Sequence, residues 1–366
     1  YYQPDTENYN TAFGYGALGG PIAGGELNVA VGNNALDALT SGDNNVAVGY
    51  DAGTAITTGH RNVFVGQGAG TAITTGTHTV AIGNAAASGY DTEIHNMAIG
   101  HVALGGSVAG GEYNIAIGSF AGDAITSADS SVLIGYQAGT EITTGTENMC
   151  IGVQAGQNLT TGTRTTLIGR AAGYNYDAEN DNLALGYYAL GGVVNGGEYN
   201  VAIGNYALDA LTSGDSNVAM GYNAGSAMTT MGQTICIGSS AGVGLTTGSA
   251  AQNIMIGYAT GFNLTTESHN LFIGRVADGT GTTSGCEYNV GVGNYAFQDL
   301  TTGDSNTVVG YSAGSNITTG PRNTIIGEGA GGNITEGEGN VCVGQNSGNA
   351  GTSLTTGSNN IFIGEK

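Results

Sequence analysis

The pentapeptide Asn-x-apolar-apolar-Gly returns twenty-one times along this chain, in most cases after a step of seventeen residues. The first copy spans residues 10–14 and the last spans residues 360–364. The closing glycine is present in every copy, and the opening asparagine is replaced only by Thr79, Ser131, Thr165 and Thr234. A fixed period of this length identifies a repeat array in which each unit packs mainly on its neighbours.

Each repeat unit carries strand and turn signals in a fixed order. Val, Ile and Thr favour strands, whereas Gly, Asn, Asp and Ser mark the bends. Each unit is therefore predicted to form a strand, a bend, a second short strand and a second bend. The chain is predicted to be an all-β parallel β-solenoid of about 21 coils of 17 residues. With neighbouring strands roughly 4.8 Å apart, it would form a rod about 100 Å long.

The core strand is predicted to present an apolar stripe outside the coil. Successive side chains of a strand point to opposite faces. We expect the fourth core position, with residues such as Val31, Ile82 and Ile117, to fill the coil, and the third position to point outward. The third position is never charged or amide-bearing. A stripe of this length requires burial by other copies of the chain, most simply around a symmetry axis. Its residues include Phe64, Leu133, Cys150, Leu167, Cys236, Met255, Phe272, Cys342 and Phe362.

The asparagines that open the cores are predicted to stack as a ladder of side-chain amides. They recur at the same phase of successive coils, so each lies one strand spacing from the next. The ladder is expected to be structural. Its members include Asn28, Asn45, Asn62, Asn96, Asn114, Asn148, Asn200, Asn217 and Asn340.

A longer period is superimposed on the coils. Gly-Gly-Glu-Leu-Asn or Gly-Gly-Glu-Tyr-Asn occurs at 24–28, 110–114 and 196–200, and Cys-Glu-Tyr-Asn occurs at 286–289. The single array of residues 1–366 therefore contains five-coil blocks at about 10–95, 96–181, 182–269 and 270–366. Gene duplication explains the blocks, and a recurring binding patch is the alternative.

The charge excludes some classes of partner. A net charge of −22 with only six basic residues disfavours nucleic acids and anionic membrane surfaces. The sequence has no transmembrane stretch or signal peptide. It begins Tyr1-Tyr2, which we interpret as processing or a fragment. Of the four cysteines, Cys150, Cys236 and Cys342 are expected to act as small apolar groups many coils apart, and Cys286 lies in a wide turn.

Residues suited to catalysis do not converge in this pattern. The chain is predicted not to be an enzyme and to need no cofactor. The coils at 79–95 and 165–181 lose the Thr-Thr-Gly bend and are expected to form solvated acidic bulges. A calcium site or a glycan-cleaving carboxylate pair is the alternative, and its candidates are Asp91, Glu93, Asp177 and Glu179.

Histidines and tyrosines recur in the bends. His60, His78, His95 and His269 are expected to be exposed turn residues, with a metal ladder as the alternative. A tyrosine follows the core glycine in several coils, among them Tyr50. These rings are expected to cover the bend and one another, with sugar stacking as the alternative.

The core and its extension, as in residues 200–207 with Ala-Gly-x-x-Ile-Thr-Thr-Gly closing other coils, resemble two groups of repeats. One is the head repeat of YadA-type trimeric autotransporter adhesins, and the other is found in bacteriophage tail fibres. The resemblance implies a left-handed β-roll in a homotrimer, used as a spacer.

We therefore expect the structural shaft of an extracellular trimeric fibre on a virion or cell surface. It would space and display elements that bind a receptor or a cell-surface glycan. The alternative is a bacterial or archaeal surface adhesin, or a filament whose copies join end to end.

Overall fold

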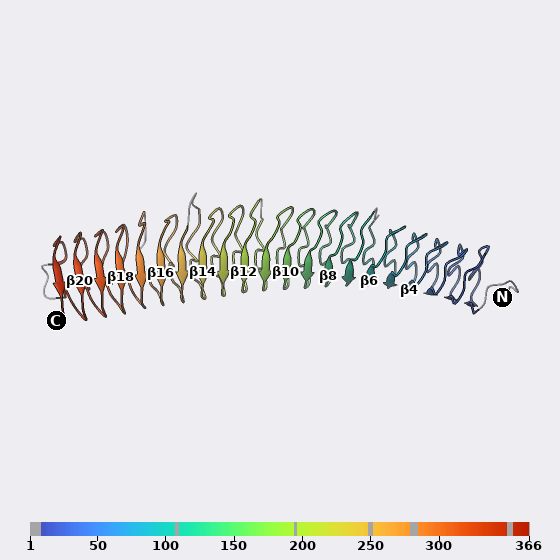
Figure 1. The fold of residues 1–366 in the computed structure, drawn as a ribbon, viewed down its shortest axis with the longest axis horizontal. Helices are drawn as coiled ribbons and strands as arrows, with labels where there is room; N and C mark the ends of the chain where they lie inside the picture. Colours follow the sequence, from blue (N-terminus) through green and yellow to red (C-terminus); the bar gives the residue numbers. More distant parts are fainter. Residues whose placement is uncertain are drawn as a thin grey trace. The chain divides into compact units, whose positions relative to one another are not determined.

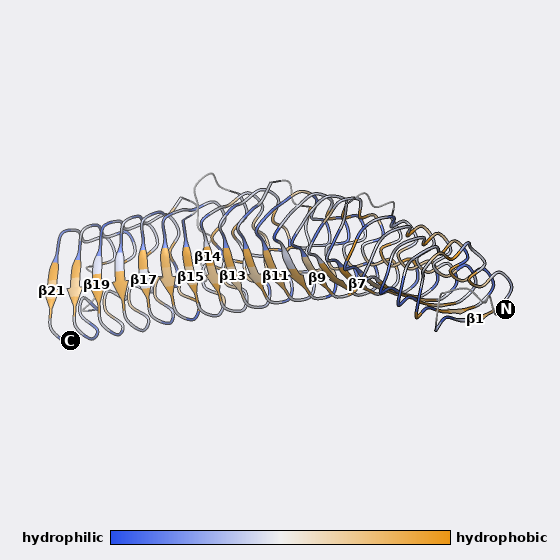
Figure 2. Cartoon of the chain, turned by 45° about the vertical axis from the view of Figure 1, so that its right-hand side comes forward, coloured by the Kyte–Doolittle hydropathy of each residue, from blue (hydrophilic) through white to orange (hydrophobic). Residues whose placement is uncertain are grey.

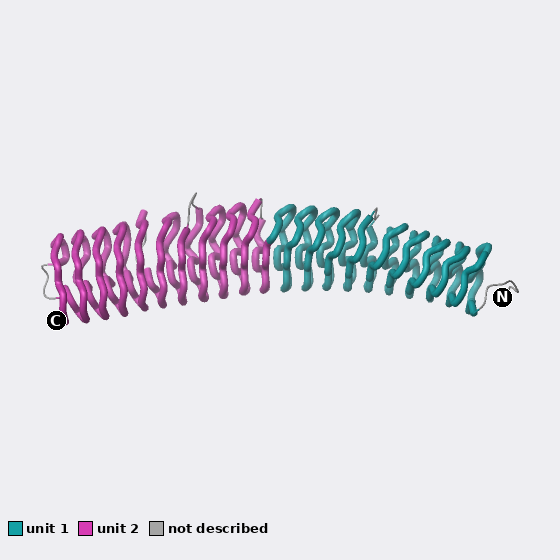
Figure 3. The backbone as a smooth tube through the Cα atoms, viewed as in Figure 1, with its two compact units in different colours: residues 1–181 teal, residues 182–366 magenta. Residues whose placement is uncertain are grey.

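The computed structural model describes residues 9–106, 110–193, 196–247, 252–278, 285–349 and 354–365. The chain divides into two compact units, residues 1–181 and residues 182–366 (Figure 3). The division falls where the second of the four predicted blocks ends. Each unit is a stack of coils, and each pentapeptide core supplies one three-residue strand. The chain is thus an all-β parallel β-solenoid with coils of about seventeen residues, as predicted.

The described residues of the first unit form ten strands, each paired in parallel with the next one along the chain (Figure 1). Like positions lie side by side, so Ala47 pairs with Phe64 and Phe64 with Ala81. The strands are β1 (Thr11–Phe13), β2 (Val29–Val31), β3 (Val46–Val48), β4 (Val63–Val65), β5 (Val80–Ile82), β6 (Met97–Ile99), β7 (Ile115–Ile117), β8 (Val132–Ile134), β9 (Met149–Ile151) and β10 (Thr166–Ile168).

In the second unit, the part of the chain that the structure describes forms eleven strands with the same parallel, sequential pairing. Its strands are β11 (Leu183–Leu185), β12 (Val201–Ile203), β13 (Val218–Met220), β14 (Ile235–Ile237), β15 (Ile254–Ile256), β16 (Leu271–Ile273), β17 (Val290–Val292), β18 (Thr307–Val309), β19 (Thr324–Ile326), β20 (Val341–Val343) and β21 (Ile361–Ile363).

The predicted second short strand of each coil is wrong. Turns and bends follow the core strand instead, with residues in the left-handed region, such as Asn34 at φ 56° and Leu36 at φ 53°. Positive φ values alternating with ordinary ones curl the backbone and prevent an extended segment. Adjacent coils still share backbone hydrogen bonds there, as from the Thr40 N–H to the Thr57 carbonyl at 2.9 Å.

The predicted assignment of the two strand faces is inverted. In β2 the middle residue Ala30 is buried, whereas Val29 and Val31 on either side are half-exposed. The opening Asn28 is also buried, and alternation then places Ala30 on the same inward face. Alanine is the most frequent residue at this interior third position, and larger residues such as Phe64 occupy it in other coils. The outward residues are the branched ones at the second and fourth positions.

The proposed outward stripe is therefore wrong for the residues assigned to it. The third-position side chains are buried by their own chain and cannot lie on an axis between copies. Phe362 in β21 is half-buried, and the other members are fully or almost fully buried: Phe64, Leu133, Cys150, Leu167, Cys236, Met255, Phe272 and Cys342. The four cysteines are free and buried. Burial raises the pKa of Cys150 to about 12, as expected for a thiol in an apolar interior.

Bulky interior side chains pack against glycine residues. The ring of Phe64 fills space at two turn glycines, because a Cβ on Gly53 or Gly70 would lie 2.6 or 2.5 Å from it. The reverse arrangement occurs in β17, where the middle residue is Gly291 and a Cβ there would lie 2.8 Å from the ring of Phe297. The strand and the turn therefore share a fixed interior volume, which is what close packing requires.

The closing glycine of the core is required by both conformation and space. Gly135 has φ +139°, and a Cβ there would lie 2.3 Å from the carbonyl oxygen of Gly152 in the next coil. A φ in this region is essentially restricted to glycine. Because the same approach recurs between successive coils, the sequence retains glycine at this phase throughout. Among the described residues there is no helix long and apolar enough to cross a membrane.

Candidate interaction surface

The outward face of each unit's sheet is aliphatic. Each strand places its first and third residues on this face, and none of these residues is charged or amide-bearing in any of the twenty-one strands. In Figure 2 strands such as β21, β17 and β15 have the colour of hydrophobic residues, whereas the strands beside the β19 label are paler. Hydroxyl groups occur on this face only at Thr11, Thr166, Thr307 and Thr324.

These outward side chains keep substantial contact with solvent. Val48 and Ile82 are each 37% exposed, and Ile326 is 42% exposed. In-register pairing places each aliphatic side chain beside its equivalent in the next coil, as Val48 lies beside Val65. Within each unit the face is therefore a row of partly exposed side chains, mostly Val, Ile, Leu and Met, with two threonines in each unit and Phe13 in the first. Soluble monomers rarely leave an apolar patch of this extent open.

The opening asparagines form buried ladders in both units. The Asn45 Nδ2 donates to the Asn28 Oδ1 at 3.1 Å and to the Gly59 carbonyl at 2.9 Å. The Asn45 Oδ1 accepts the backbone N–H and the Nδ2 of Asn62, both at 3.1 Å. Every asparagine named for the ladder is buried: Asn28, Asn45, Asn62, Asn96, Asn114, Asn148, Asn200, Asn217 and Asn340. Their amide groups are satisfied inside the chain, so they hold the coils and do not face a ligand.

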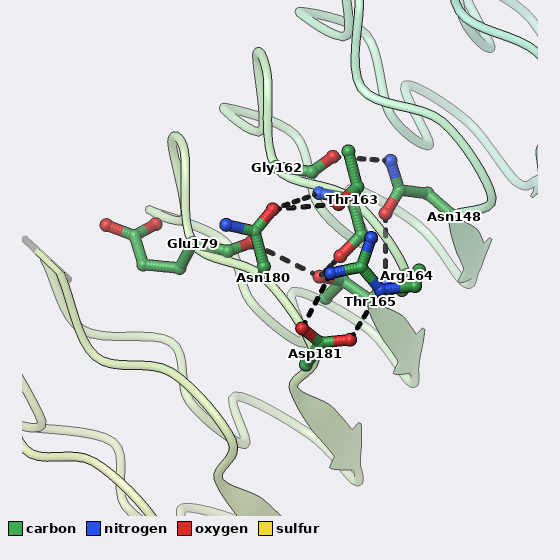
Figure 4. Close-up of polar contacts among 8 residues, drawn as sticks. All are labelled: Asn148, Gly162, Thr163, Arg164, Thr165, Glu179, Asn180 and Asp181. Atoms are coloured by element: carbon green, nitrogen blue, oxygen red, sulfur yellow. Dashed lines mark hydrogen bonds and ion pairs between the residues drawn. The ribbon is translucent and has the colours of Figure 1, made fainter.

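The ladder is weaker where threonine replaces asparagine. In Figure 4 the Asn148 amide donates to the Gly162 carbonyl at 2.7 Å and accepts the Thr165 N–H at 3.0 Å. The Thr165 hydroxyl lies 3.3 Å from both the Glu179 and the Thr163 carbonyl oxygens, so it replaces the asparagine amide with longer hydrogen bonds. The shorter side chain of Thr79 leaves its buried hydroxyl without a hydrogen-bond partner in the described part of the chain.

Restoring the ladder at this gap is expected to stabilise the first unit. In a Thr79→Asn variant the new amide would continue the pattern from Asn62 towards Asn96, and we expect about 1–3 kcal/mol of added unfolding free energy. Urea unfolding followed by circular dichroism measures it. Thr79→Val is the control, because it only removes the unpaired hydroxyl. An equal gain in both variants would contradict a role for the amide.

The acidic bulges predicted near Asp91 and Asp177 are absent. The coil that starts at Thr79 keeps the ordinary length of seventeen residues. Tyr90 is buried where other coils carry Leu or Ile, and Glu93 is buried where they carry the glycine of Thr-Thr-Gly. Tyr176 and Glu179 repeat this arrangement. These residues replace others at fixed positions of a coil of ordinary length. The predicted bulge is therefore wrong.

The carboxylate of Glu93 is held by backbone donors. Its Oε2 accepts the N–H groups of Asp91 and Thr92 at 2.8 and 3.0 Å, and its Oε1 accepts the Gly110 N–H at 3.0 Å. The Glu179 Oε2 accepts the N–H groups of Asp177 and Ala178 at 2.9 and 3.2 Å. Carboxylates that already accept N–H groups are poorly placed to ligate Ca²⁺, which needs several free oxygen ligands.

The aspartates of this region also have protein partners. The Asp91 Oδ1 accepts the Thr74 hydroxyl, and the Asp177 Oδ1 accepts the Thr160 hydroxyl. Over the residues that the structure describes, no group of three or more His, Cys, Asp or Glu side chains could hold a metal ion. The four candidates thus act as hydrogen-bond acceptors within their turns.

A third member of this set, Glu267, was not predicted from the sequence. The Glu267 Oε2 accepts the N–H groups of Thr265 and Thr266 at 2.5 and 2.9 Å, and its Oε1 accepts the Gly285 N–H at 3.1 Å. The signal was present, because Glu93, Glu179 and Glu267 each replace the glycine of the bend one coil before a wide turn. The block period therefore has a structural basis in a carboxylate that supports the wide turn.

Imidazole rings stack along one row of bends. His78 and His95 have ring centroids 4.8 Å apart and planes 17° apart, and His95 stacks on Tyr113 at 5.1 Å. Nearly parallel rings direct their nitrogen lone pairs side by side, so they do not converge on one ion as metal ligands do. Desolvation, followed by His95 and Arg61, lowers the pKa of His78.

Tyrosines after the core glycine pack on each other. Tyr206 meets Tyr187 and Tyr222 edge to face, at centroid distances of 5.1 and 6.3 Å. Arg275 lies over the rings of Tyr258 and Tyr295 at 5.8 and 5.5 Å. Edge-to-face pairs and cation–π contacts stabilise neighbouring coils. The rows thus contribute to packing, although rings such as Tyr222 stay exposed.

Compared with protein-family models, curated proteins and solved structures, this chain gives no match.

Proposed function

We propose that the chain is the structural shaft of an extracellular fibre, formed by copies that associate through the outward aliphatic face. The observation that carries the proposal is the row of half-exposed Val and Ile residues in each unit. Burying this face removes apolar surface from water, which contributes about 25 cal/mol per Å². As in the prediction from the sequence, copies of the chain would bury an apolar face of the strands against one another. The residues of that face are those at the second and fourth core positions, in place of those at the third.

A homotrimer is the proposed assembly, because the repeats resemble those of trimeric adhesins and tail fibres. Copies of a chain with a net charge of −22 repel one another, so they are expected to associate only through a surface without charged side chains. The outward aliphatic face is such a surface. Cyclic association of three identical rows around one axis satisfies that condition. The buried asparagine ladders and interior packing supply a stiff support, which suits spacing and multivalent display of receptor-binding elements.

Two aspartates on the outward face are expected to abolish association. In an Ile117→Asp/Ile134→Asp variant, each carboxylate would be buried between copies without a partner, at a cost of about 2–5 kcal/mol. Analytical ultracentrifugation should show trimers for the natural chain and monomers for this variant. Circular dichroism should show unchanged β-structure, because both side chains lie outside the coil.

Thr144→Asp/Thr161→Asp is the matched control, because it adds the same charge to adjacent coils at exposed bend positions. This variant should assemble like the natural chain. A natural chain that stays monomeric in dilute buffer would overturn the proposal, and so would an Ile117→Asp/Ile134→Asp variant that still forms trimers.

A further inference from the structure

One aspartate occupies the interior of a coil in the second unit. Asp278 is only 1% exposed, and its Oδ2 has no hydrogen-bond partner among the described residues. Its backbone has φ 59°, and its N–H donates to the Ala296 carbonyl at 2.9 Å. The side chain thus points where other coils place apolar groups. A buried ionised carboxylate without a partner is strongly unfavourable.

The other blocks carry leucine at this place. The position directly follows the interior alanine of the wide-turn coil, and its equivalents are Leu18, Leu104 and Leu190, with φ values of 51°, 49° and 49°. The backbone is therefore the same, and only the side chain differs. The same coil also has the buried Cys286 where the equivalents are Gly25, Gly111 and Gly197.

Among the residues that the structure describes, the groups around Asp278 do not neutralise its charge. Glu267 lies nearby with its carboxylate held by three N–H groups, and the Cys286 thiol, which also has Asp304 near it, is a second acidic neighbour. Arg275 of the same coil is exposed between Tyr258 and Tyr295. The described ion pairs elsewhere are Arg164–Asp181 and Arg322–Glu338, so none reaches Asp278.

We infer that the Asp278 coil, residues 270–278 and 285–288, is a pH-dependent weak point of the second unit. At low pH the neutral carboxyl group packs in the interior. As pH rises, the carboxylate is favoured only when the coil opens and water reaches it. Local opening of a coil needs no global unfolding, because contacts in a repeat array are mainly with neighbours.

The direction of the pH effect on coil stability follows from the difference between the pKa of Asp278 in the closed coil and its pKa in the open coil. Burial first, and Glu267 second, raises the pKa of Asp278 well above its ordinary value. The closed coil then binds a proton that the open coil has released. Closure is fully stable below about pH 4, the ordinary pKa of aspartate, and loses stability as pH rises towards the pKa in the closed coil. Over that interval the opening equilibrium constant rises up to about tenfold per pH unit.

Hydrogen exchange of the natural chain, read by mass spectrometry between pH 5 and pH 8, tests this. Exchange chemistry alone gives a tenfold rise in rate per pH unit. Residues 97–104, in the equivalent coil with Leu104, should follow that slope. Residues 271–278 should rise faster, up to about a hundredfold per pH unit, because opening and chemistry both accelerate. Equal slopes for the two segments would overturn the inference.

Two variants identify the responsible group. Asp278→Asn keeps the shape and removes the titration, and Asp278→Leu restores the residue of the other blocks, so both should return residues 271–278 to the tenfold slope. Glu328→Gln removes one exposed carboxylate from the same unit and should leave the steep slope unchanged. A steep slope that survives Asp278→Asn would assign the effect to another group and refute the inference.

Discussion

A Gly135→Ala variant is expected to lose about 4 kcal/mol or more of unfolding free energy in the first unit. The new Cβ would lie 2.3 Å from the Gly152 carbonyl oxygen, on a backbone with φ +139°. Conformational strain of this kind costs about 1–3 kcal/mol, and the clash with backbone adds to it. The neighbouring coil cannot retreat without breaking its own strand pairing. Urea unfolding followed by circular dichroism measures the loss.

Gly24→Ala separates the two causes. Gly24 has φ +117°, and a Cβ added there would have no atom within 4 Å. This variant should therefore show the strain alone, about 1–3 kcal/mol. If Gly135→Ala cost no more than Gly24→Ala, close approach of successive coils would not explain the closing glycine.

Phe64→Ala is expected to destabilise the first unit by about 3–5 kcal/mol, because it leaves a cavity in a closely packed interior. The ring borders the turn glycines Gly53 and Gly70 of two coils. Gly70→Leu alone should also destabilise the unit, since its Cβ would lie 2.5 Å from the same ring. Calorimetry or urea unfolding of each variant gives the two single costs.

The double variant Phe64→Ala/Gly70→Leu should recover part of the loss. It reproduces the arrangement of the natural coil in which Ala30 in the strand faces Leu36 in the turn. The interaction energy of the double-mutant cycle is expected to be favourable by about 1–3 kcal/mol. Costs that simply add would show that strand and turn do not share one interior volume.

The fold was predictable because the same strand and turn signals recur in every coil. The seventeen-residue period defines the coil, and the recurring Asn45-type position predicts a ladder before any contact is known. Tyr90 and Glu93 were misjudged because their meaning depends on phase within the coil. Glu93 meets Gly110 seventeen residues later. Only the coil geometry brings those two residues together, and no local pattern states it.

The direction of the strand faces was not predictable from alternation. In Val29-Ala30-Val31 all three residues are apolar, so a period of two does not say which face is inside. The decisive residue is Asn28, whose amide needs partners that a neighbouring coil provides. Reading the ladder residue as inward-facing would have placed Ala30 inside and Val31 outside. The outward face therefore consists of the residues directly before and after the one that was predicted to form it, and these residues are apolar as well.

The exchange of volume between Phe64 and its two glycines restricts how such a chain can evolve in length. Whole coils can be gained or lost, because each one meets its neighbours through like positions. A coil that carries a large strand residue, as at Phe64, nevertheless leaves less room for side chains in the turns that border it. Recombination within the gene is therefore tolerated mainly where the coils that become neighbours have interior side chains that fit each other. When a five-coil block is copied, all contacts between its coils are preserved except those at its two ends.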